Sequence, residues 1–373
     1  MIKSKLLILL LAINITMFSQ IENLTEQFIL PTELEENSGL IFYDNKIITH
    51  NDSGGQASLF ELDTDTNQIT RTINITNATN TDWEDITQDN NYIYIGDFGN
   101  NNGTRTDLKI YKIAKSDFNV NNNITATVIN FHYEDQNDFS DNSQTNFDAE
   151  AMIVYNNTIH LFTKNRGDFK TKQYTIPNIA GDYTATLLNT YNVNGLITGA
   201  TLNPTYNSVF LIGYSYYLDP FIIILDEMNE DITFNNFTKI ELFSEIGKNQ
   251  TEGICLMSDT NFYISSEKFT YNTTTYNQKL FTFDYNPSVN SIDNFNKSEY
   301  LVYPNPAKNE LSLKNIPLNS ELLIYNSNGI LVESKKINSS NYKWNRSINI
   351  IDGIYFIKIV SNNKSITKKI YLN

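Results

Sequence analysis

The chain has 373 residues, with 27 Lys and Arg against 42 Asp and Glu, and a net charge of −15. This length allows one large core and a second, small domain, and an acidic balance of this size argues against non-specific nucleic-acid binding. The charge is uneven, because residues 20–299 carry a net charge of −23 whereas residues 300–373 carry a net charge of +6. Such an asymmetry indicates two units with different roles.

Residues 1–19 have the features of a secretory signal peptide. Lys3 and Lys5 precede an apolar segment, and the small Ser19 marks a plausible cleavage point. No later segment is apolar enough to span a membrane. Cys255 is the single cysteine of the chain, so an intramolecular disulfide is excluded, and its apolar neighbours predict a buried, inert thiol.

The region from residue 20 to residue 286 repeats a short pattern. Each copy contains a position, here called the anchor position, that is followed within about a dozen residues by a short apolar strand. The residues at this position are Ser38, Glu84, Glu150, Thr198 and Glu252. The spacings of 46, 66, 48 and 54 residues, with several short strands per copy, are typical of a β-propeller. We therefore predict an all-β fold with five blades.

The predicted strands account for almost all of this region. Three strands can be assigned to each of the first four copies, and the fifth copy stops one strand short. A strand near Phe28 has no partner in its own copy, so we expect it to complete the last blade and close the ring. The alternative is a sixth blade hidden in residues 134–147, although the composition of that segment is typical of a polar loop.

Residues 287–299 read as a polar linker, and residues 300–373 as a separate unit. This unit contains the run Tyr303-Pro304-Asn305-Pro306 followed by NELSL, and later GIYFI from Gly353 followed by a basic strand. With these motifs it resembles the type A sorting domain of the type IX secretion system. The resemblance implies a small β-sandwich, the secretion machinery as a partner, and export across the outer membrane of a Bacteroidetes-type bacterium. A secreted or cell-surface protein is the expected result.

The anchor positions carry the candidate metal ligands. In a propeller the first strand of each blade lines the central channel, so equivalent positions converge. Glu84, Glu150 and Glu252 share the anchor position, and Glu36 lies two residues before Ser38, on the same face of the strand. Carboxylates brought this close need protons or a cation, and Ca²⁺, which takes six to eight oxygen ligands, is the first candidate. The alternative is that each Glu braces its own blade by bonding a neighbouring backbone.

Further polar side chains are expected at the mouth of the channel, where the second strands end. These are Asp52, Asp97, Lys164 and Glu267. Asp52 and Asp97, together with His50, are the candidate catalytic residues, and His50 could act as a general base or a metal ligand. A turn residue that bonds the following backbone is an equal interpretation of His50. Trp83 could form a substrate platform, although packing between blades is the favoured interpretation.

From about Glu36 to Tyr285 the chain resembles uncharacterised secreted bacterial propellers. The shared phrases are ENSGL, THNDSGG, DWEDI, IGDFGNN, FDAEAM, ITGATLNP and QTEGI. More distantly it is similar to the SdiA-regulated, NHL-type and gluconolactonase-like propellers. The gluconolactonase group binds a divalent cation in the channel through a first-strand Glu in an E-G-P context. Glu252-Gly253 matches this context in part, with Ile254 in place of Pro.

The sequence supports two hypotheses about function. The first is a monomeric, secreted or surface-attached propeller with a cation-binding channel face, acting as a binding or scaffold module for a small molecule or glycan. The second is a metal-dependent hydrolase of lactones, phosphoesters or sugars that uses the same site. What separates them is whether a bound metal keeps an open position with a base within reach.

Overall fold

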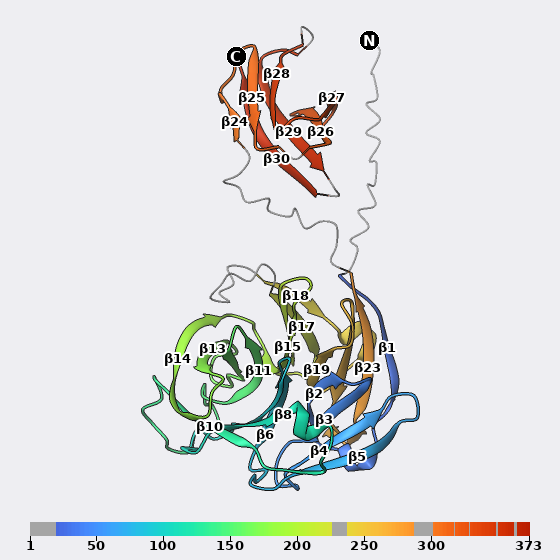
Figure 1. Ribbon diagram of the computed structural model, residues 1–373, viewed down its shortest axis with the longest axis vertical. Helices are drawn as coiled ribbons and strands as arrows, with labels where there is room; N and C mark the ends of the chain where they lie inside the picture. The colour runs from blue at the N-terminus through green and yellow to red at the C-terminus, as the bar shows by residue number, and fades with distance from the viewer. Residues whose placement is uncertain are drawn as a thin grey trace, which may run out of the picture. The chain divides into compact units, whose positions relative to one another are not determined.

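The computed structural model describes residues 20–225, 237–286 and 301–373, apart from positions 317, 328, 348–349 and 362–363. The predicted signal peptide and linker lie outside the described residues. The chain divides into two compact units, one of which spans Ile21–Asn286. The other contains the described residues from Leu301 to Asn373 (Figure 1).

The larger unit is built almost entirely of short antiparallel strands. Within the described residues these strands form five groups of four. The first group is β2 (Asn37–Tyr43), β3 (Lys46–Asn51), β4 (Ser58–Asp63) and β5 (Gln68–Ile75). The second is β6 (Trp83–Gln88), β7 (Tyr92–Asp97), β8 (Lys109–Ala114) and β10 (Thr127–Tyr133). The third is β11 (Ala149–Tyr155), β12 (Thr158–Thr163), β13 (Thr171–Pro177) and β14 (Gly181–Tyr191).

The last two groups follow the same pattern. The fourth is β15 (Leu196–Asn203), β16 (Ser208–Tyr214), β17 (Pro220–Leu225) and β18 (Thr238–Glu241). The fifth is β19 (Thr251–Leu256), β20 (Asn261–Ser266), β23 (Lys279–Tyr285) and β1 (Ile21–Ile29). The remaining elements are η1 (Thr32–Leu34), α1 (Lys115–Phe118), β9 (Asn123–Ile124), α2 (Phe243–Ile246), β21 (Phe269–Tyr271) and β22 (Thr274–Tyr276). No helix among the described residues is long and apolar enough to cross a membrane.

The five groups are arranged around their first strands. These strands contact one another in the closed order β2, β6, β11, β15, β19 and back to β2. Two parallel pairings also link neighbouring groups at their outer edges: β10 pairs with β14, and β9 pairs with β5. The first of these pairings joins the second and third groups into one eight-stranded sheet.

The fifth group is completed by the start of the unit. β1 pairs antiparallel with β23, from Ile21 opposite Tyr285 to Ile29 opposite Lys279. This is the pairing that the sequence predicted, although the strand starts seven residues before Phe28. The earlier start was missed because β1 is an outer strand in which few side chains are buried, so its apolar signal is weak.

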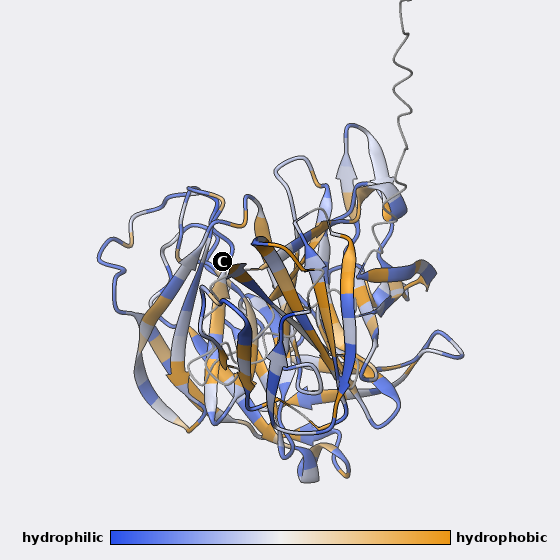
Figure 2. Cartoon of the chain, turned by 90° about the horizontal axis from the view of Figure 1, so that it is seen from above, coloured by the Kyte–Doolittle hydropathy of each residue, from blue (hydrophilic) through white to orange (hydrophobic). Residues whose placement is uncertain are grey.

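Packing between groups explains the composition of the strands. The first strands are buried along most of their length, and Figure 2 shows hydrophobic residues concentrated on the strands and hydrophilic residues in the connecting loops. Aromatic rings fill the spaces between neighbouring groups: Phe210 of β16 lies 4.5 Å from Phe262 of β20, centroid to centroid. Residues 134–147 contain no strand, as expected for a polar loop.

Asp85 connects three of the first strands at the centre of the ring. Its carboxylate accepts hydrogen bonds from the backbone N–H groups of Ile86 at 2.8 Å and of Met152 in β11 at 2.7 Å, and it also bonds the backbone of Ala200 in β15. Burial raises the pKa of Asp85 well above its usual value. Gly39 permits this arrangement, because a Cβ at that position would lie 2.8 Å from Asp85 Oδ1.

The smaller unit contains two sheets around one core. The first sheet is β24 (Leu301–Tyr303), β25 (Glu310–Lys314) and β28 (Asn341–Asn345). The second is β27 (Leu331–Ile337), β26 (Ser320–Asn326), β29 (Gly353–Ser361) and β30 (Lys364–Leu372). Leu311 and Trp344 from the first sheet pack with Ile324 and Ile357 from the second. The whole chain is therefore all-β, with almost no helix among its described residues.

Candidate functional site

The anchor position of every group lies at a β-bulge. In each pair of first and second strands the register shifts across this position, for example between Trp83 and Asp85 in β6 and between Thr251 and Gly253 in β19. The same shift occurs in β2, β11 and β15. A bulge leaves one residue unpaired and re-aims its side chain. The repeat in the sequence thus corresponds to a β-bulge that recurs in every group. In each group the bulge leaves the anchor residue outside the regular pairing of the two strands.

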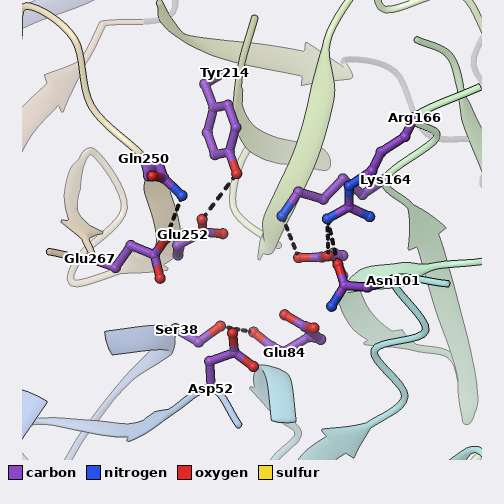
Figure 3. A pocket seen from close by; sticks show the side chains of 11 residues that line it. Ser38, Asp52, Glu84, Asn101, Lys164, Arg166, Tyr214, Gln250, Glu252 and Glu267 are labelled. Atoms are coloured by element: carbon purple, nitrogen blue, oxygen red, sulfur yellow. Dashed lines mark hydrogen bonds and ion pairs between the residues drawn. The ribbon is translucent and has the colours of Figure 1, made fainter. Parts of the chain in front are cut away.

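Four of the five anchor residues line one cavity of about 180 Å³ (Figure 3). Its lining is Ser38, Asp52, Glu84, Asn101, Glu150, Lys164, Arg166, Tyr214, Gln250, Glu252 and Glu267. All of these side chains are polar, and five carboxylates face two cationic groups. The cavity therefore carries excess negative charge when all of the carboxylates are ionised.

One side of the cavity is neutralised by the protein itself. Lys164 Nζ lies 3.0 Å from Glu150 Oε2, and Arg166 forms an ion pair with Asp148. Arg166 also lies 3.7 Å from Glu150 Oε1 and donates a hydrogen bond of 2.6 Å to Asn101 Oδ1. Burial lowers the pKa of Lys164, but the combined charges of Glu150, Tyr214 and Glu252 outweigh this effect, and the pKa lies well above its usual value. Glu150 and Asp148 thus already have fixed counter-ions.

The neighbouring carboxylates have no such ion pair, although Glu84 also places an oxygen within 4.8 Å of oxygens of Asp148 and Glu150. Asp52, Asp82 and Glu84 each place one carboxylate oxygen so that the three atoms lie within 4.8 Å of one another. Glu84 is only 4% exposed, and no donor among the described residues bonds its carboxylate. Asp52 Oδ1 is likewise buried without a partner in the described part of the chain. Gly99 allows this close approach, because a Cβ there would collide with Glu84 Oε1 and with Asp82.

Burial and mutual repulsion disfavour the charged forms of these groups. The pKa of Asp52 is raised to about 9, first by burial and then by the charges of Asp82 and Glu150. Burial, followed by the charges of Glu150 and Asp52, raises the pKa of Glu84 well above its usual value. The pKa of Asp148 is raised to about 7 by burial and by Glu150. The cavity therefore holds protons at neutral pH unless a cation replaces them.

Two anchor hydroxyls act as braces instead of ligands. Ser38 Oγ donates a hydrogen bond to the backbone carbonyl of Glu84 in the next first strand, and Thr198 Oγ1 donates to the carbonyl of Thr251 at 2.6 Å. Thr198 does not line the cavity. Glu252 does line it and accepts a hydrogen bond of 3.4 Å from the Tyr214 hydroxyl. The hydroxyls of Ser38 and Thr198 thus bond neighbouring first strands in the way that the alternative interpretation proposed for the glutamates.

Several residues singled out in the sequence do not line the cavity. Glu36 is exposed and does not line it. His50 is fully buried, its ring lies 5.7 Å from the Trp83 ring, and burial lowers its pKa to about 4. Asp97 pairs with Arg105 at 2.9 Å. Trp83 is fully buried in the core between groups and donates to the carbonyl of Thr79, which is the packing role favoured for it.

Sequence reasoning missed Asp82 and Asp148, although a signal for them exists. Both lie two residues before an anchor Glu, and Gln250 lies two residues before Glu252. Residues two apart on a strand point to the same side, so these positions could have been grouped with the anchors. Tyr214 stands at the end of a second strand, as Asp52, Lys164 and Glu267 do, so its position carried the same signal. Asn101 and Arg166 carry no comparable signal, because they come from loops of unequal length.

Comparisons with known proteins identify the smaller unit. Residues 301–373 match the family model of the secretion system C-terminal sorting domain. Among solved structures, the chain is similar to PorZ, an essential bacterial surface component of the type-IX secretion system of Porphyromonas gingivalis, with 14% identity and a TM-score of 0.38. That similarity covers 90% of this chain and 45% of PorZ, so the chain spans less than half the length of that relative.

A second solved structure is a mitotic checkpoint complex, with 8% identity, a TM-score of 0.36, and coverage of 75% of this chain and 99% of the other. Neither structural similarity is close enough to carry an argument about fold or function. No curated protein matches the chain. The sorting-domain match confirms the expected localisation: the chain is a secreted or cell-surface protein exported by type IX secretion.

Proposed function

We propose that residues 21–286 form a five-bladed β-propeller that serves as a secreted or cell-surface binding module, with a divalent cation in its channel. Five four-stranded groups around a closed cycle of first strands support the propeller interpretation. The observation that carries the cation proposal is the group of Asp52, Asp82 and Glu84, whose oxygens lie within 4.8 Å of one another without a fixed counter-ion.

The proposed ligands differ in part from those expected from the repeat. Glu84 stays at the centre of the site, while Asp52 and Asp82 replace Glu36, which is exposed. Glu150 is already paired with Lys164 at 3.0 Å, so its oxygens contribute less to a cation. Ca²⁺ remains the first candidate, because it accepts an irregular set of carboxylate, amide and water oxygens, whereas Mg²⁺ demands near-octahedral geometry.

The hydrolase hypothesis receives less support from the site. His50, the expected general base, is buried against Trp83 and does not line the cavity. Asp52 does line it, and burial with neighbouring charges raises its pKa to about 9, so without a cation it is protonated and cannot act as a base at neutral pH. We therefore propose a binding role.

Cation binding is tested by thermal unfolding of chelator-treated protein. A cation that binds only the folded state stabilises it by RT ln(1 + [L]/Kd), about 2.7 kcal/mol at a hundredfold excess over Kd. We expect Ca²⁺ to raise the melting temperature, and Glu84→Gln or Asp52→Asn to remove most of this shift. Glu33→Gln, which alters an exposed carboxylate outside the cavity, is the matched control and should keep the full shift. If Ca²⁺, Mg²⁺ and Mn²⁺ all leave the melting temperature unchanged, the carboxylates have a structural role only.

We also propose that the propeller folds without the sorting domain. The two units are separately compact, and each has its own hydrophobic core. A truncated protein ending at Ser298 should therefore be soluble and unfold cooperatively at nearly the temperature of the full chain, as measured by circular dichroism. Insolubility, or loss of a cooperative transition, would show that the two units depend on each other.

A further inference from the structure

A second cavity, of about 450 Å³, lies at the other end of the first strands. It is lined by residues of all five first strands and by the loop before β7. The lining is Leu40, Ile41, Phe42, Ile86, Thr87, Gln88, Asp89, Asn90, Lys115, Val154, Tyr155, Asn156, Ala200, Thr201, Leu202, Pro204, Cys255 and Leu256. Its volume lies within the range of small-molecule sites.

This cavity is chemically unlike the acidic one. Its floor is apolar and buried, with Leu40, Ile86, Ala200 and Cys255 each at most 2% exposed. Its rim is formed by half-exposed side chains such as Phe42, Tyr155 and Leu202. The binding free energy becomes more favourable when an apolar group displaces water from a floor of this kind.

The rim also carries polar groups that are only partly paired. Lys115 stacks over the Tyr43 ring at 4.5 Å and interacts electrostatically with Asp89, but it forms no ion pair within 4.0 Å of a carboxylate in the described residues. Gln88 Oε1 is buried without a hydrogen-bond partner there. Asp89 also lines the cavity, but its carboxylate already accepts hydrogen bonds from the Tyr94 hydroxyl at 2.6 Å and from the backbone N–H groups of Asn91 and Tyr92.

We propose that this cavity binds an amphipathic organic anion, a molecule with an aliphatic or aromatic body and a carboxylate or sulfonate head. The apolar floor would take the body, and the Lys115 ammonium would pair with the head. Gln88 Oε1 would accept a hydrogen bond from a donor group on the ligand, such as an amide or hydroxyl. A purely apolar ligand would leave Lys115 without an anionic partner, and a purely polar one would leave the floor in contact with water.

The proposal is independent of the cation site. Glu84 lines the acidic cavity and Ile86 lines the apolar one. Asp85, between them in the chain, bonds across the ring to the backbone of β11 and β15. The two sites therefore share four first strands, β2, β6, β11 and β19, but no lining residue, and either can be present without the other.

The test uses anilinonaphthalene sulfonate, a fluorescent probe with an aromatic body and a sulfonate head. Titration of the folded full chain should give saturable fluorescence enhancement at one site. Ala200→Trp fills the floor and should abolish it, and Leu256→Glu, at the half-exposed rim, should weaken it by adding a like charge. Lys115→Gln should weaken binding about fivefold, the value of one partly exposed ion pair.

The matched control is Lys112→Gln, which removes a cation on β8 that does not line the cavity and should leave binding unchanged. Near-ultraviolet circular dichroism confirms that each variant is folded, and Lys115→Gln and Leu256→Glu suffice if Ala200→Trp does not fold. Absence of saturable enhancement in the natural sequence would overturn the proposal. So would enhancement that the folded cavity variants leave unchanged.

Discussion

Deleting residues 20–31 should unfold the larger unit. β1 is the outer strand of the fifth group. The deleted segment contributes Ile21 of β1 and Leu30, which follows β1, to two different core clusters, where they are 8% and 2% exposed. Burial of each such side chain is worth about 1.5–3 kcal/mol, so the loss approaches the total stability of a typical domain. Its absence also exposes the edge of β23.

The deletion also removes contacts that join the two ends of the unit. Gln278 Nε2 donates to the carbonyl of Leu30 at 3.0 Å and to that of Pro31 at 3.1 Å, and the Leu30 N–H bonds the carbonyl of Gln278. We expect the truncated protein to aggregate or to lack a cooperative thermal transition by circular dichroism. Glu26→Gln, which alters only a partly exposed ion pair with Lys279, is the control and should melt like the parent. A truncated protein that melts like the parent would contradict the closure by β1.

In the absence of divalent cations, the free energy of unfolding should fall as the pH rises from about 5 to about 9. The pKa values of Asp148 and Asp52 are raised to about 7 and about 9, in both cases first by burial. A raised pKa means that the folded state holds protons that the unfolded state has released. The resulting stability is complete below the unfolded pKa and is lost as the pH rises through the folded pKa.

Each retained proton contributes a slope of about 1.4 kcal/mol per pH unit. Urea unfolding at several pH values measures this slope, and Asp52→Asn should reduce it over the whole range below pH 9. The reduction should be clearest above pH 7, where Asp148 has also released its proton. Saturating Ca²⁺ should flatten the profile, because the cation replaces the protons. A profile without cation that is level or rising over this range would mean that the cavity does not hold carboxylic acids at neutral pH.

Much of the architecture could be predicted from the sequence because local patterns report local structure. The short apolar runs predicted the strands, and the polar composition of residues 134–147 predicted a loop. The structure confirms both predictions. The unpaired strand near Phe28 predicted the contact with β23, because a group that is one strand short needs a partner. The motif around Tyr303 identified the sorting domain, since it is contiguous in the chain.

The repeated anchor position could also be recognised in the sequence, but the structural reason for the repeat could not. Glu84, Glu150 and Glu252 share it because each occupies a bulge in its first strand. A bulge is a property of the pairing between two strands. The sequence of either strand alone therefore does not show where the bulge lies.

By itself the sequence determined which residues could converge, and only the tertiary structure decided which of them remain without a partner. Lys164 and Arg166 neutralise Glu150 and Asp148, which leaves Asp52, Asp82 and Glu84 as the group without a counter-ion. Charge pairing depends on distances of a few ångströms between side chains from different strands. Spacing along the chain carries no information at that scale. The repeat predicts that Lys164 follows a second strand, but it does not predict the ion pair of Lys164 with Glu150, and Arg166 lies in a loop outside the repeat.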